Sequence, residues 1–466
     1  MKLPFKNAET YHFVGIGGIG MSAIAQIMHC QGYNVQGSDK TANANVKRLR
    51  NAYNLKISIG HDAHHIDAAT TLVISTAIKE NNPELIAAKA RNIPVFRRAE
   101  MLAKIMEPKR NIAVSGTHGK TSTTAMIAAM LAAGEKDPTV INGGIIPDFD
   151  SNAKMGKGEW LVTEADESDG SFLELPVNIA VVTNIDPEHM DYHRTKERLS
   201  EAFSEFIGKA DLAIVCLDDS NVKHLISNSH ENNLVTYGLN PSANVRAIGL
   251  RKLKGKSIFD VIISDNKGNT IQKLEAVCLC FPGEHNIVNA LAAIAIAKEL
   301  KLSDSQIKEG LEHYRGVERR FTQTGEVSGV CIIDDYAHHP REIRAALNAA
   351  RQNCNKKIIA IMQPHRYTRL RDLFDDFSTC FDACDMLLIT DVYSAGEPPI
   401  DGYDSNTLLA EIQRRGHISA RKISDFEELA KFLSSVTAEG DMIIFMGAGN
   451  ITDWANALPS RLEALL

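Results

Sequence analysis

The stretch VSGTHGKTSTT, from Val114 to Thr124, constrains the fold of this chain more than any other part of the sequence. It follows an apolar run, NIAVS, and leads into STTAMIAAMLAAG, which has the composition and spacing of a helix. A strand, a glycine turn and a helix in that order are typical of a parallel α/β sheet. The stretch matches only the second half of the phosphate-loop pattern G-x-x-x-x-G-K-[ST], because Val114 stands where the first glycine belongs.

The residues that do match suit the binding of phosphate groups. The amino end of a helix exposes backbone N–H groups and carries a partial positive charge, and glycines let the backbone approach phosphate oxygens closely. Lys120 would add a full positive charge, and the Thr121 hydroxyl suits a magnesium ion that bridges the phosphates. An ordinary turn between strand and helix is the alternative interpretation. We favour a nucleoside triphosphate site formed by Gly116, Thr117, His118, Gly119, Lys120 and Thr121.

Length and composition limit the class of protein. A chain of 466 residues is too long for one core and predicts about three domains. A net charge of −7 argues against a nucleic-acid-binding surface. No apolar run approaches the length of a membrane span, and the first residues lack the apolar core of a signal peptide. The eight cysteines include no C-x-x-C pair and are expected to be buried free thiols, so we predict a cytoplasmic protein.

Three segments repeat the alternation of strands and helices that defines an α/β fold. We predict a first βαβ domain over residues 1–108, a larger central domain over 109–316 and a third domain over 317–466. Between Asn244 and Phe281 the helical period disappears, which predicts a small antiparallel extension of the central domain. Ligands of open α/β sheets bind at the carboxyl ends of the strands. The polar residues singled out below all follow predicted strands.

A glycine pattern follows the first predicted strand. Gly15, Gly17 and Gly20 form G-x-G-x-x-G, and Asp39 ends the next strand, as in dinucleotide-binding domains. Such a loop binds a diphosphate, but nothing in it demands nicotinamide, because a nucleoside-diphosphate sugar presents the same group. Close packing of the strand and helix without a ligand is a third interpretation.

Acidic residues crowd the ends of two strands in the central domain. TEADESDGSF places Glu164, Asp166 and Glu167 together, and like charges this close need cations or donors to offset them. If the sheet brings Glu164 and His189, from TNIDPEHMDYH, beside Thr121, they would suit a second magnesium ion. The alternative is that these are acidic surface loops exposed to solvent.

Further polar residues lie at a helix start, at the second domain junction and after strands of the third domain. His285, Asn286 and Asn289 begin a helix, where they would bind a nucleotide or simply cap the helix. Two arginines three apart suit carboxylate or phosphate recognition. A zinc site built on the histidines is a weaker hypothesis, because a closed ligand set is missing. The junction and third-domain candidates are Arg319, Arg320, Asp335, Tyr336, His338, His339, His365, Arg366 and Arg369.

Taken in order, these motifs resemble the Mur ligase family, the ATP-dependent amide-bond ligases of peptidoglycan precursor synthesis. The resemblance extends through the chain and rests on HFVGIGGIGMSAIA, EADESDGSF, FPGEHNIVNALAA, GVERRF, DDYAHHPREI and PHRYTR. The phosphate loop of the family is the shortened form G-T-x-G-K-[ST], which explains why Val114 replaces a glycine. Several members also carry a carbamylated lysine, for which this sequence offers no clear counterpart.

The resemblance implies a fold and an activity. It implies an N-terminal Rossmann-like domain for a UDP-sugar, a central P-loop ATPase-type domain for ATP, and a C-terminal Rossmann-like domain for an amino acid. The implied reaction joins L-alanine to the lactyl carboxylate of UDP-N-acetylmuramate through an acyl phosphate, with ATP and Mg²⁺. The expected partners are these small molecules, with neither nucleic acid nor membrane, and we expect a monomer or a homodimer.

The resemblance also implies roles for individual residues. The implied catalytic residues are Lys120, Glu164, His189 and His338, and the implied metal ligands are Thr121, Glu164 and His189. ATP would contact Gly116 to Ser122, His285, Asn286, Asn289 and Arg320. The UDP-sugar would contact Gly15, Gly17, Gly18, Ile19, Gly20, Ser38, Asp39, Ser75, Thr76 and His118. The carboxylate and the amino acid would contact Tyr336, His338, Arg366 and Arg369.

Three alternatives stay open at this point. A recycling ligase that joins UDP-N-acetylmuramate to a preformed peptide would have the same architecture and chemistry, although GIGGIGMSAIA favours the alanine-adding activity. A nicotinamide-dependent oxidoreductase would explain the first glycine loop and Asp39, but neither the second loop nor the carboxylates. A non-catalytic nucleotide-binding regulator is the third alternative, and the crowded carboxylates, which suit a metal ion, argue against it.

Overall fold

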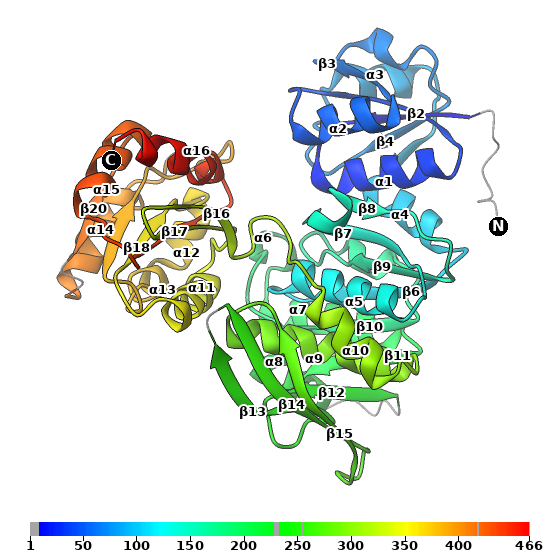
Figure 1. Ribbon diagram of the computed structural model, residues 1–466. Helices are drawn as coiled ribbons and strands as arrows, with labels where there is room; N and C mark the ends of the chain where they lie inside the picture. Colours follow the sequence, from blue (N-terminus) through cyan, green and yellow to red (C-terminus); the bar gives the residue numbers. More distant parts are fainter. Residues whose placement is uncertain (1–8, 228–232, 254, 417–418, 466) are drawn as a thin grey trace. The chain divides into compact units, whose positions relative to one another are not determined.

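The computed structural model describes residues 9–227, 233–253, 255–416 and 419–465 (Figure 1). These residues form two compact units, each of which is described by itself. The first unit comprises the described parts of Met1–Ile248, Asp260–Val277 and Val288–Arg315. The second comprises the described parts of Gly249–Phe259, Cys278–Ile287 and Gly316–Leu466.

The first unit begins with a sheet of five parallel strands in the order β3-β2-β1-β4-β5. This is the order of the Rossmann fold, in which the strand order reverses beside the first strand. Its elements are β1 (Thr10–Val14), α1 (Ile19–Cys30), β2 (Asn34–Asp39), α2 (Ala44–Tyr53), β3 (Lys56–Ile59), η1 (Ala63–Ile66), β4 (Thr71–Ile74), α3 (Pro83–Ala90), β5 (Val95–Arg97) and α4 (Arg98–Met106).

Helix α1 is buried on more than one face. Every residue from Met21 to Met28 is buried, and Gln26 donates from Nε2 to the carbonyl oxygen of Ala153 at 2.7 Å. The Ser151 hydroxyl donates to Gln26 Oε1 at 2.8 Å. A helix that packs against elements on both sides needs apolar or small residues all round, which the sequence MSAIAQIM provides.

The central sheet has ten strands in the order β15-β14-β13-β12-β11-β10-β6-β9-β7-β8. The phosphate-loop strand β6 pairs in parallel with β9 on one side and β10 on the other. The elements up to the middle of the domain are β6 (Arg110–Ser115), α5 (Lys120–Ala133), β7 (Thr139–Ile146), η2 (Pro147–Phe149), β8 (Ser151–Lys154), β9 (Trp160–Glu164), η3 (Ser171–Glu174), β10 (Ile179–Val182), α6 (Met190–His193) and α7 (Lys196–Gly208). The remaining elements are β11 (Leu212–Cys216), α8 (Ser220–Ser227), β12 (Leu234–Gly238), β13 (Val245–Leu253), β14 (Lys256–Ser264), β15 (Thr270–Leu279), α9 (Glu284–Glu299) and α10 (Asp304–Glu312).

The strands predicted between Asn244 and Phe281 are confirmed. They are β13, β14 and β15, which follow one another at one edge of the central sheet. The basic run at Arg251–Lys256 spans the β13–β14 turn, and its described side chains are exposed. A charged, solvated turn therefore explains this run.

The second unit contains a six-stranded sheet in the order β16-β17-β21-β18-β19-β20. All neighbours are parallel except β16 and β17. Two clusters of buried apolar residues pack against the sheet. Pro340 is the first residue of α11, as predicted. The elements are β16 (Thr322–Val327), β17 (Val330–Asp335), α11 (Pro340–Asn353), β18 (Ile358–Met362), α12 (Tyr367–Asp372), α13 (Phe374–Phe377), β19 (Met386–Ile389), α14 (Ser405–Arg414), β20 (Ala420–Lys422), α15 (Phe426–Val436), β21 (Met442–Met446) and α16 (Ile451–Glu463).

The cysteines match the prediction only in part. All eight are free thiols, but the expectation of burial is wrong for Cys30, which is exposed at the end of α1. Cys278 in β15, Cys280 directly after it and Cys331 in β17 are partly exposed. In the described part of the chain, every helix is too short or too polar to cross a bilayer.

Candidate functional site

The phosphate-loop segment connects β6 to α5 in the manner that the sequence predicts. Strand β6 ends at Ser115, α5 begins at Lys120, and the four residues between them form a tight turn. Gly116 and Gly119 have φ angles of +126° and +85°, in the region that favours glycine. A side chain at either position would be strained. The glycines therefore shape a loop around the amino end of α5.

Close contacts reinforce this requirement for glycine. A Cβ atom on Gly116 would lie 2.2 Å from the Thr183 hydroxyl and 2.9 Å from the carbonyl oxygen of Asn184. A Cβ on Gly119 would lie 2.8 Å from Oδ1 of Asn289, on α9. The loop is thus held between the end of β10 and the first turns of α9, with no room for side chains at its glycines.

The Lys120 ammonium lies inside the loop and faces acidic residues. Its Nζ donates to the carbonyl oxygen of Gly116 at 2.6 Å and to both carboxylate oxygens of Glu167 at 2.9 and 3.0 Å. Burial lowers the pKa of Lys120, but the charges of Glu167, Asp166 and Glu164 outweigh this effect and raise it above its ordinary value. The side chain therefore carries a positive charge at neutral pH.

The acidic stretch after β9 lies at the same edge of the sheet as the loop. Glu164 is the last residue of β9, pairs in register with Val114 of β6, and accepts from the Gly143 amide at 2.5 Å. Asp166 lies 3.5 Å from the guanidinium of Arg98. Burial raises the pKa of Asp166, but Lys120, Ser168 and Arg98 hold it below its ordinary value. The acidic stretch thus lies beside the Lys120 ammonium.

The segment after β10 packs on the loop from the other side. The Asn184 side chain accepts from the His118 amide at 2.8 Å and donates to the His118 carbonyl at 2.9 Å. The Thr117 hydroxyl accepts from the Asp186 amide at 2.8 Å, and His118 Nε2 lies 3.1 Å from the Asp186 carboxylate. His189 follows at the start of α6, with a φ of +56° that is unusual outside glycine. Both flanking strands thus deliver polar groups to the phosphate loop.

These residues fit a nucleoside triphosphate and a divalent cation. The amino end of α5, the lysine and the two glycines form a cradle for phosphate oxygens, which a Cβ at either glycine would obstruct. Glu164, Asp166 and Glu167 supply the hard oxygen donors that Mg²⁺ prefers. Among the described residues, no three His, Cys, Asp or Glu side chains are grouped so that they could hold a metal ion.

The first glycine loop is fixed by the end of β2. The amides of Gly15 and Ile16 donate to the carbonyl oxygen of Ser38 at 2.8 and 3.0 Å. The Gly17 amide donates to Asp39 Oδ2 at 2.8 Å, and Asn45 donates from Nδ2 to the Gly17 carbonyl at 2.9 Å. The Asp39 carboxylate thus bonds to the loop itself, whereas the dinucleotide fingerprint directs it to a ribose.

The remaining first-domain candidates lie at the same edge of the sheet. Gly18 caps α1, Gly20 lies in its first turn, and Ile19 is unusually exposed for an isoleucine, at 39%. Ser75 and Thr76 directly follow β4, the strand beside β1. The structure therefore places these predicted residues around the amino end of α1.

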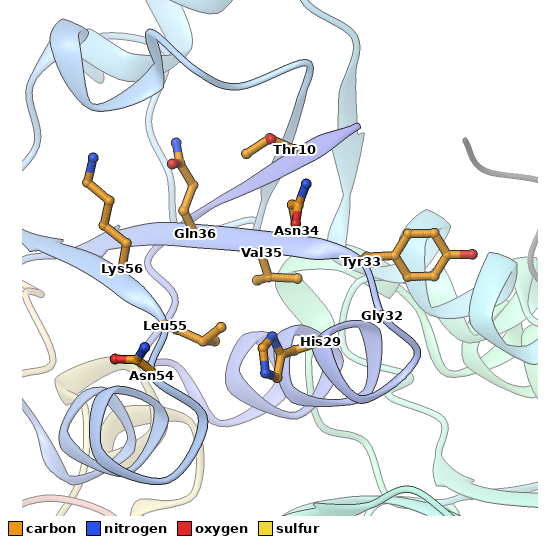
Figure 2. Close-up of a pocket in the computed structure, with 10 residues that line it drawn as sticks. All are labelled: Thr10, His29, Gly32, Tyr33, Asn34, Val35, Gln36, Asn54, Leu55 and Lys56. Carbon is orange, nitrogen blue, oxygen red and sulfur yellow. The ribbon is translucent and has the colours of Figure 1, made fainter. Parts of the chain in front are cut away.

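A cavity of about 370 Å³ in the same domain lies elsewhere (Figure 2). Its lining includes Thr10, Asn34 and Lys56, which begin or nearly begin β1, β2 and β3, and His29 and Gly32 at the end of α1. This is the amino edge of the sheet, opposite the glycine loop. The carboxyl end of a helix carries partial negative charge, so the cavity is poorly suited to a diphosphate.

In the second unit, polar residues gather at the carboxyl ends of β17, β18, β19 and β21. The ring of His338 lies 5.2 Å from that of Tyr336 and 5.8 Å from that of His365, centroid to centroid. His365 stacks on Tyr393 at 5.5 Å, and Arg369 contacts His365 Nδ1 at 3.2 Å. The ends of β17, β18 and β19 thus bring together residues that are separated by 57 positions along the chain, from 336 to 393.

This second cluster is rich in cations and has a neutral histidine at its centre. Burial, His338 and the neighbouring arginines lower the pKa of His365 to about 3. Arg366 has a φ of +68° and lies 4.0 Å from Glu397. Arginine side chains around a neutral imidazole suit a carboxylate-bearing ligand.

Arg319 and Arg320 lie against the ring of Tyr336. Their guanidinium carbons are 4.8 and 5.1 Å from its centroid, and Arg319 donates to the carbonyl oxygen of Gly447 at 2.7 Å. Burial raises the pKa of Asp335 to about 6, although Arg320 and two backbone amides oppose the shift. The junction arginines therefore belong to the cluster in the second unit.

The three residues of α9 that the sequence suggests for nucleotide binding or helix capping have different surroundings. Asn286 donates from Nδ2 to the carbonyl oxygen of Pro282 at 2.7 Å, which stabilises the start of the helix. Burial and Arg320 lower the pKa of His285 to about 4. Asn289 lies beside Gly119 of the phosphate loop. The geometry of Asn289 therefore suits nucleotide contact, and that of Asn286 suits capping.

Several residues at these sites were not singled out from the sequence. Asn184, Arg98, Tyr393 and Glu397 are examples, and Gly447 belongs to the segment GAGN after β21. Their common signal is that most directly follow a strand or begin a helix at the ligand edge. Sequence alone does not show which of many such residues face one another.

Comparisons with known proteins agree along the whole chain. Family models match at residues 10–110 (Mur ligase family, catalytic domain), 114–297 (Mur ligase middle domain) and 319–449 (Mur ligase, glutamate ligase domain). A UDP-N-acetylmuramate–L-alanine ligase of Chelativorans sp. (strain BNC1) is 51% identical over 465 residues, which cover 99% of this chain and 100% of that protein.

Solved structures give the same picture. The crystal structure of a UDP-N-acetylmuramate-alanine ligase from Thermotoga maritima is similar, with a TM-score of 0.84 and 30% identity, and covers 98% of this chain and 100% of that one. A murein peptide ligase from Psychrobacter arcticus has a TM-score of 0.71 at 21% identity, over 98% and 99% of the two chains. The second likeness is one of fold alone.

Proposed function

Because the chain belongs to the Mur ligase family, we propose that it joins L-alanine to the lactyl carboxylate of UDP-N-acetylmuramate in a reaction driven by ATP. The observation that carries this proposal is the 51% identity, over almost the entire chain, to a relative with that activity in its name. The shortened phosphate loop, with Lys120 bonded to Glu167, supplies the chemistry that such a ligase needs.

The reaction follows from the chemistry of its substrates. A carboxylate does not react with an amine until one of its oxygens becomes a leaving group. In the first step, a lactyl carboxylate oxygen attacks the γ-phosphorus of ATP, and the bond from that phosphorus to the ADP oxygen breaks. In the second step, the amine of alanine attacks the acyl carbon, and inorganic phosphate leaves with the carboxylate oxygen. The amine must lose its proton, and we propose His189 or His338 as acceptors.

We assign ATP to the phosphate loop of the central domain. Lys120 would neutralise charge on the β- and γ-phosphates, and the amides at the start of α5 would bind phosphate oxygens. Glu167, to which Lys120 is bonded, would orient the ammonium for that contact. We assign further contacts with ATP to Ser122, Asn289, His285, Asn286 and Arg320.

Magnesium is assigned to the same region. Thr121, Glu164 and His189 are the residues that would hold it, and they follow β6, β9 and β10, which are neighbours in the sheet. When bound, Mg²⁺ neutralises negative charge on the transferring phosphoryl group. Glu167 and Asp166 would keep Lys120 charged and correctly oriented.

We assign the UDP-sugar to the first domain and the amino acid to the third. The diphosphate would bind at the amino end of α1, beside Gly15, Gly17, Gly18, Ile19 and Gly20, with Ser38, Asp39, Ser75, Thr76 and His118 nearby. Arg366 and Arg369 would bind carboxylates, and Tyr336 and His338 would position the amine. The predictions of a cytoplasmic protein and of a monomer or homodimer remain predictions.

The test is mass spectrometry of the products formed from UDP-N-acetylmuramate, L-alanine, ATP and Mg²⁺, with each component omitted in turn. The proposal requires UDP-N-acetylmuramoyl-L-alanine only in the complete mixture. Ligation of a preformed tripeptide but not of alanine would identify the recycling activity. Unchanged ATP with both acceptors would contradict the proposed reaction class.

A further inference from the structure

A buried carboxylate surrounded by histidines lies behind the first glycine loop, where no part of the proposed reaction needs it. Glu84, in the first turn of α3, is completely buried. Its Oε2 accepts from the Ser38 hydroxyl at 2.6 Å and lies 3.0 Å from His61 Nδ1. Its Oε1 lies 2.9 Å from His65 Nδ1 and 3.6 Å from His12 Nε2. Four side chains from β1, β2, the loop after β3 and η1 thus converge on one carboxylate.

The hydrogen positions in this cluster follow from its partners. An ionised carboxylate can only accept, so the Nδ1 atoms of His61 and His65 carry hydrogens. Gln36 Nε2 donates to the carbonyl oxygen of His65 at 3.0 Å and to His12 Nδ1 at 3.1 Å. His12 therefore carries its hydrogen on Nε2, which faces Glu84. Ser38, His61 and His65 therefore donate to the carboxylate, and the Nε2–H of His12 faces it at 3.6 Å, beyond hydrogen-bond distance.

These donors keep Glu84 charged in the interior. Burial raises its pKa, but His12, Ser38 and His65 outweigh this effect and lower it to about 2. A buried charge with complete hydrogen bonding has one favoured geometry, so it fixes its partners more firmly than an apolar contact would. The histidine nitrogens bond to the carboxylate, and the described residues form no metal site here.

Ser38 connects this cluster to the glycine loop. Its hydroxyl is tied to Glu84, and its carbonyl oxygen accepts from the amides of Gly15 and Ile16 at 2.8 and 3.0 Å. The next residue, Asp39, accepts from the Gly17 amide at 2.8 Å. Rotation of Ser38 away from Glu84 would therefore move the backbone that sets the loop and the first turn of α1.

We propose that Glu84 is a positioning residue for the diphosphate of the nucleotide sugar, which it serves by holding Ser38 and, through the Ser38 carbonyl, the loop Gly15–Gly17. The inference rests on the proposed function, in which this loop binds UDP-N-acetylmuramate. Glu84 acts through Ser38 and does not contact the ligand. Loss of the carboxylate would weaken binding of the UDP-sugar and leave ATP binding and turnover at saturation nearly unchanged.

The experiment compares Glu84→Gln, Ser38→Ala and the double variant in steady-state kinetics with UDP-N-acetylmuramate and ATP varied in turn. We expect each single variant to raise KM for the UDP-sugar about 5- to 20-fold, with kcat and KM for ATP within about twofold of wild type. The KM of the double variant for the UDP-sugar should be no higher than that of the more affected single variant, because both changes break the same connection. Glu100→Gln, at the first turn of α4, is the matched control and should leave all constants unchanged.

The outcomes separate the inference from the proposed function. The positioning role would be overturned if the effects of the two changes on KM multiply in the double variant. It would also be overturned if either single variant leaves KM for the UDP-sugar unchanged, or raises KM for the UDP-sugar and KM for ATP equally. If Glu84→Gln does not fold, Glu84→Asp decides the matter, since it keeps the charge among the three histidines and draws the carboxylate back from the Ser38 hydroxyl. Absence of ligation by wild type would instead contradict the proposed function.

Discussion

Lys120 is the residue on which the proposed phosphoryl transfer depends most. Its ammonium contacts Glu167 and two loop carbonyls, and the surrounding carboxylates raise its pKa. The same side chain begins α5, so its position is set by the loop glycines and by the helix. Removal of this charge should therefore affect ATP chemistry more than the distant glycine loop of the first domain.

We predict that Lys120→Ala lowers the rate of ligation at least about 100-fold, because it removes charge stabilisation from the transferring phosphoryl group. Binding of UDP-N-acetylmuramate, measured by calorimetry, should stay within about twofold of wild type. Lys273→Ala is the control, since Lys273 forms ion pairs with Asp260 and Glu275 on the β14–β15 hairpin. Equal loss of ligation and UDP-sugar binding would contradict the assignment of ATP and the UDP-sugar to different domains.

His365 gives a prediction about stability and pH. Its pKa is about 3 in the folded protein, because of burial and nearby cations, against about 6.5 for an ordinary histidine. Below pH 6.5 the unfolded chain therefore binds a proton that the folded chain does not, so stability is lost as pH falls from 6.5 towards 3. Phenylalanine at this position keeps the stacking on Tyr393 but does not titrate.

Between pH 6 and pH 4, the free energy of unfolding of His365→Phe should fall less steeply than that of wild type, by up to about 1.4 kcal/mol per pH unit. Urea unfolding at a series of pH values measures both slopes. Parallel curves for wild type and His365→Phe would show that His365 is not held neutral.

Some of these residues could be predicted from the sequence, and others could not. Lys120 and Thr121 follow from a motif whose spacing fixes their chemistry. Glu84 was not predicted, because a glutamate in the first turn of a helix normally indicates only a favourable interaction with the helix dipole. Its burial depends on His12, His61 and His65 coming from three other segments, which no local pattern reveals.

At the scale of elements, the phosphate loop is defined by its glycines. Gly116 has both a positive φ and a neighbour, Thr183, that would lie 2.2 Å from an added Cβ. Gly268, in the β14–β15 turn, has a φ of +82° and nothing within 4 Å of an added Cβ. A comparison of substitutions at Gly116 and Gly268 therefore separates the folding free energy lost to an unfavourable φ from that lost to a steric clash.

We predict that Gly268→Ala costs about 1 kcal/mol of folding free energy, whereas Gly116→Ala costs about 2–4 kcal/mol and abolishes ATP binding. The clash at Gly116 must move the ends of β6 and β10 apart, which displaces the loop amides. Thermal unfolding and ATP titration of both variants provide the test. Similar costs at the two positions, with ATP binding intact in Gly116→Ala, would mean that the loop is not tightly packed.

Elements with strong patterns were predicted, and weak ones were not. The α/β alternation and the strands after Asn244 agree with the sequence. The prediction did not include β16, whose sequence TQTGEV has little apolar character, or β20, which has only three residues. Strand β7 was also missed, because the glycine pair in TVINGGII interrupts its pattern. Such strands form because neighbouring strands supply their hydrogen bonds.

At the scale of the whole molecule, sheet order decides which motifs meet. Strand β6 lies between β9 and β10, although β7 and β8 separate β6 from β9 along the chain. Composition and spacing do not determine this order, whereas the resemblance to a known family implies it. The family models cover three successive segments, and each segment contains one open sheet with candidate residues at its carboxyl edge.

The central claim is that the lactyl carboxylate is activated as an acyl phosphate and then captured by L-alanine. The most direct test uses UDP-N-acetylmuramate with both lactyl carboxylate oxygens labelled with ¹⁸O, followed by mass spectrometry of both products. The account predicts one labelled oxygen in the inorganic phosphate and one in the new amide. Phosphate without label, or label in AMP, would contradict it.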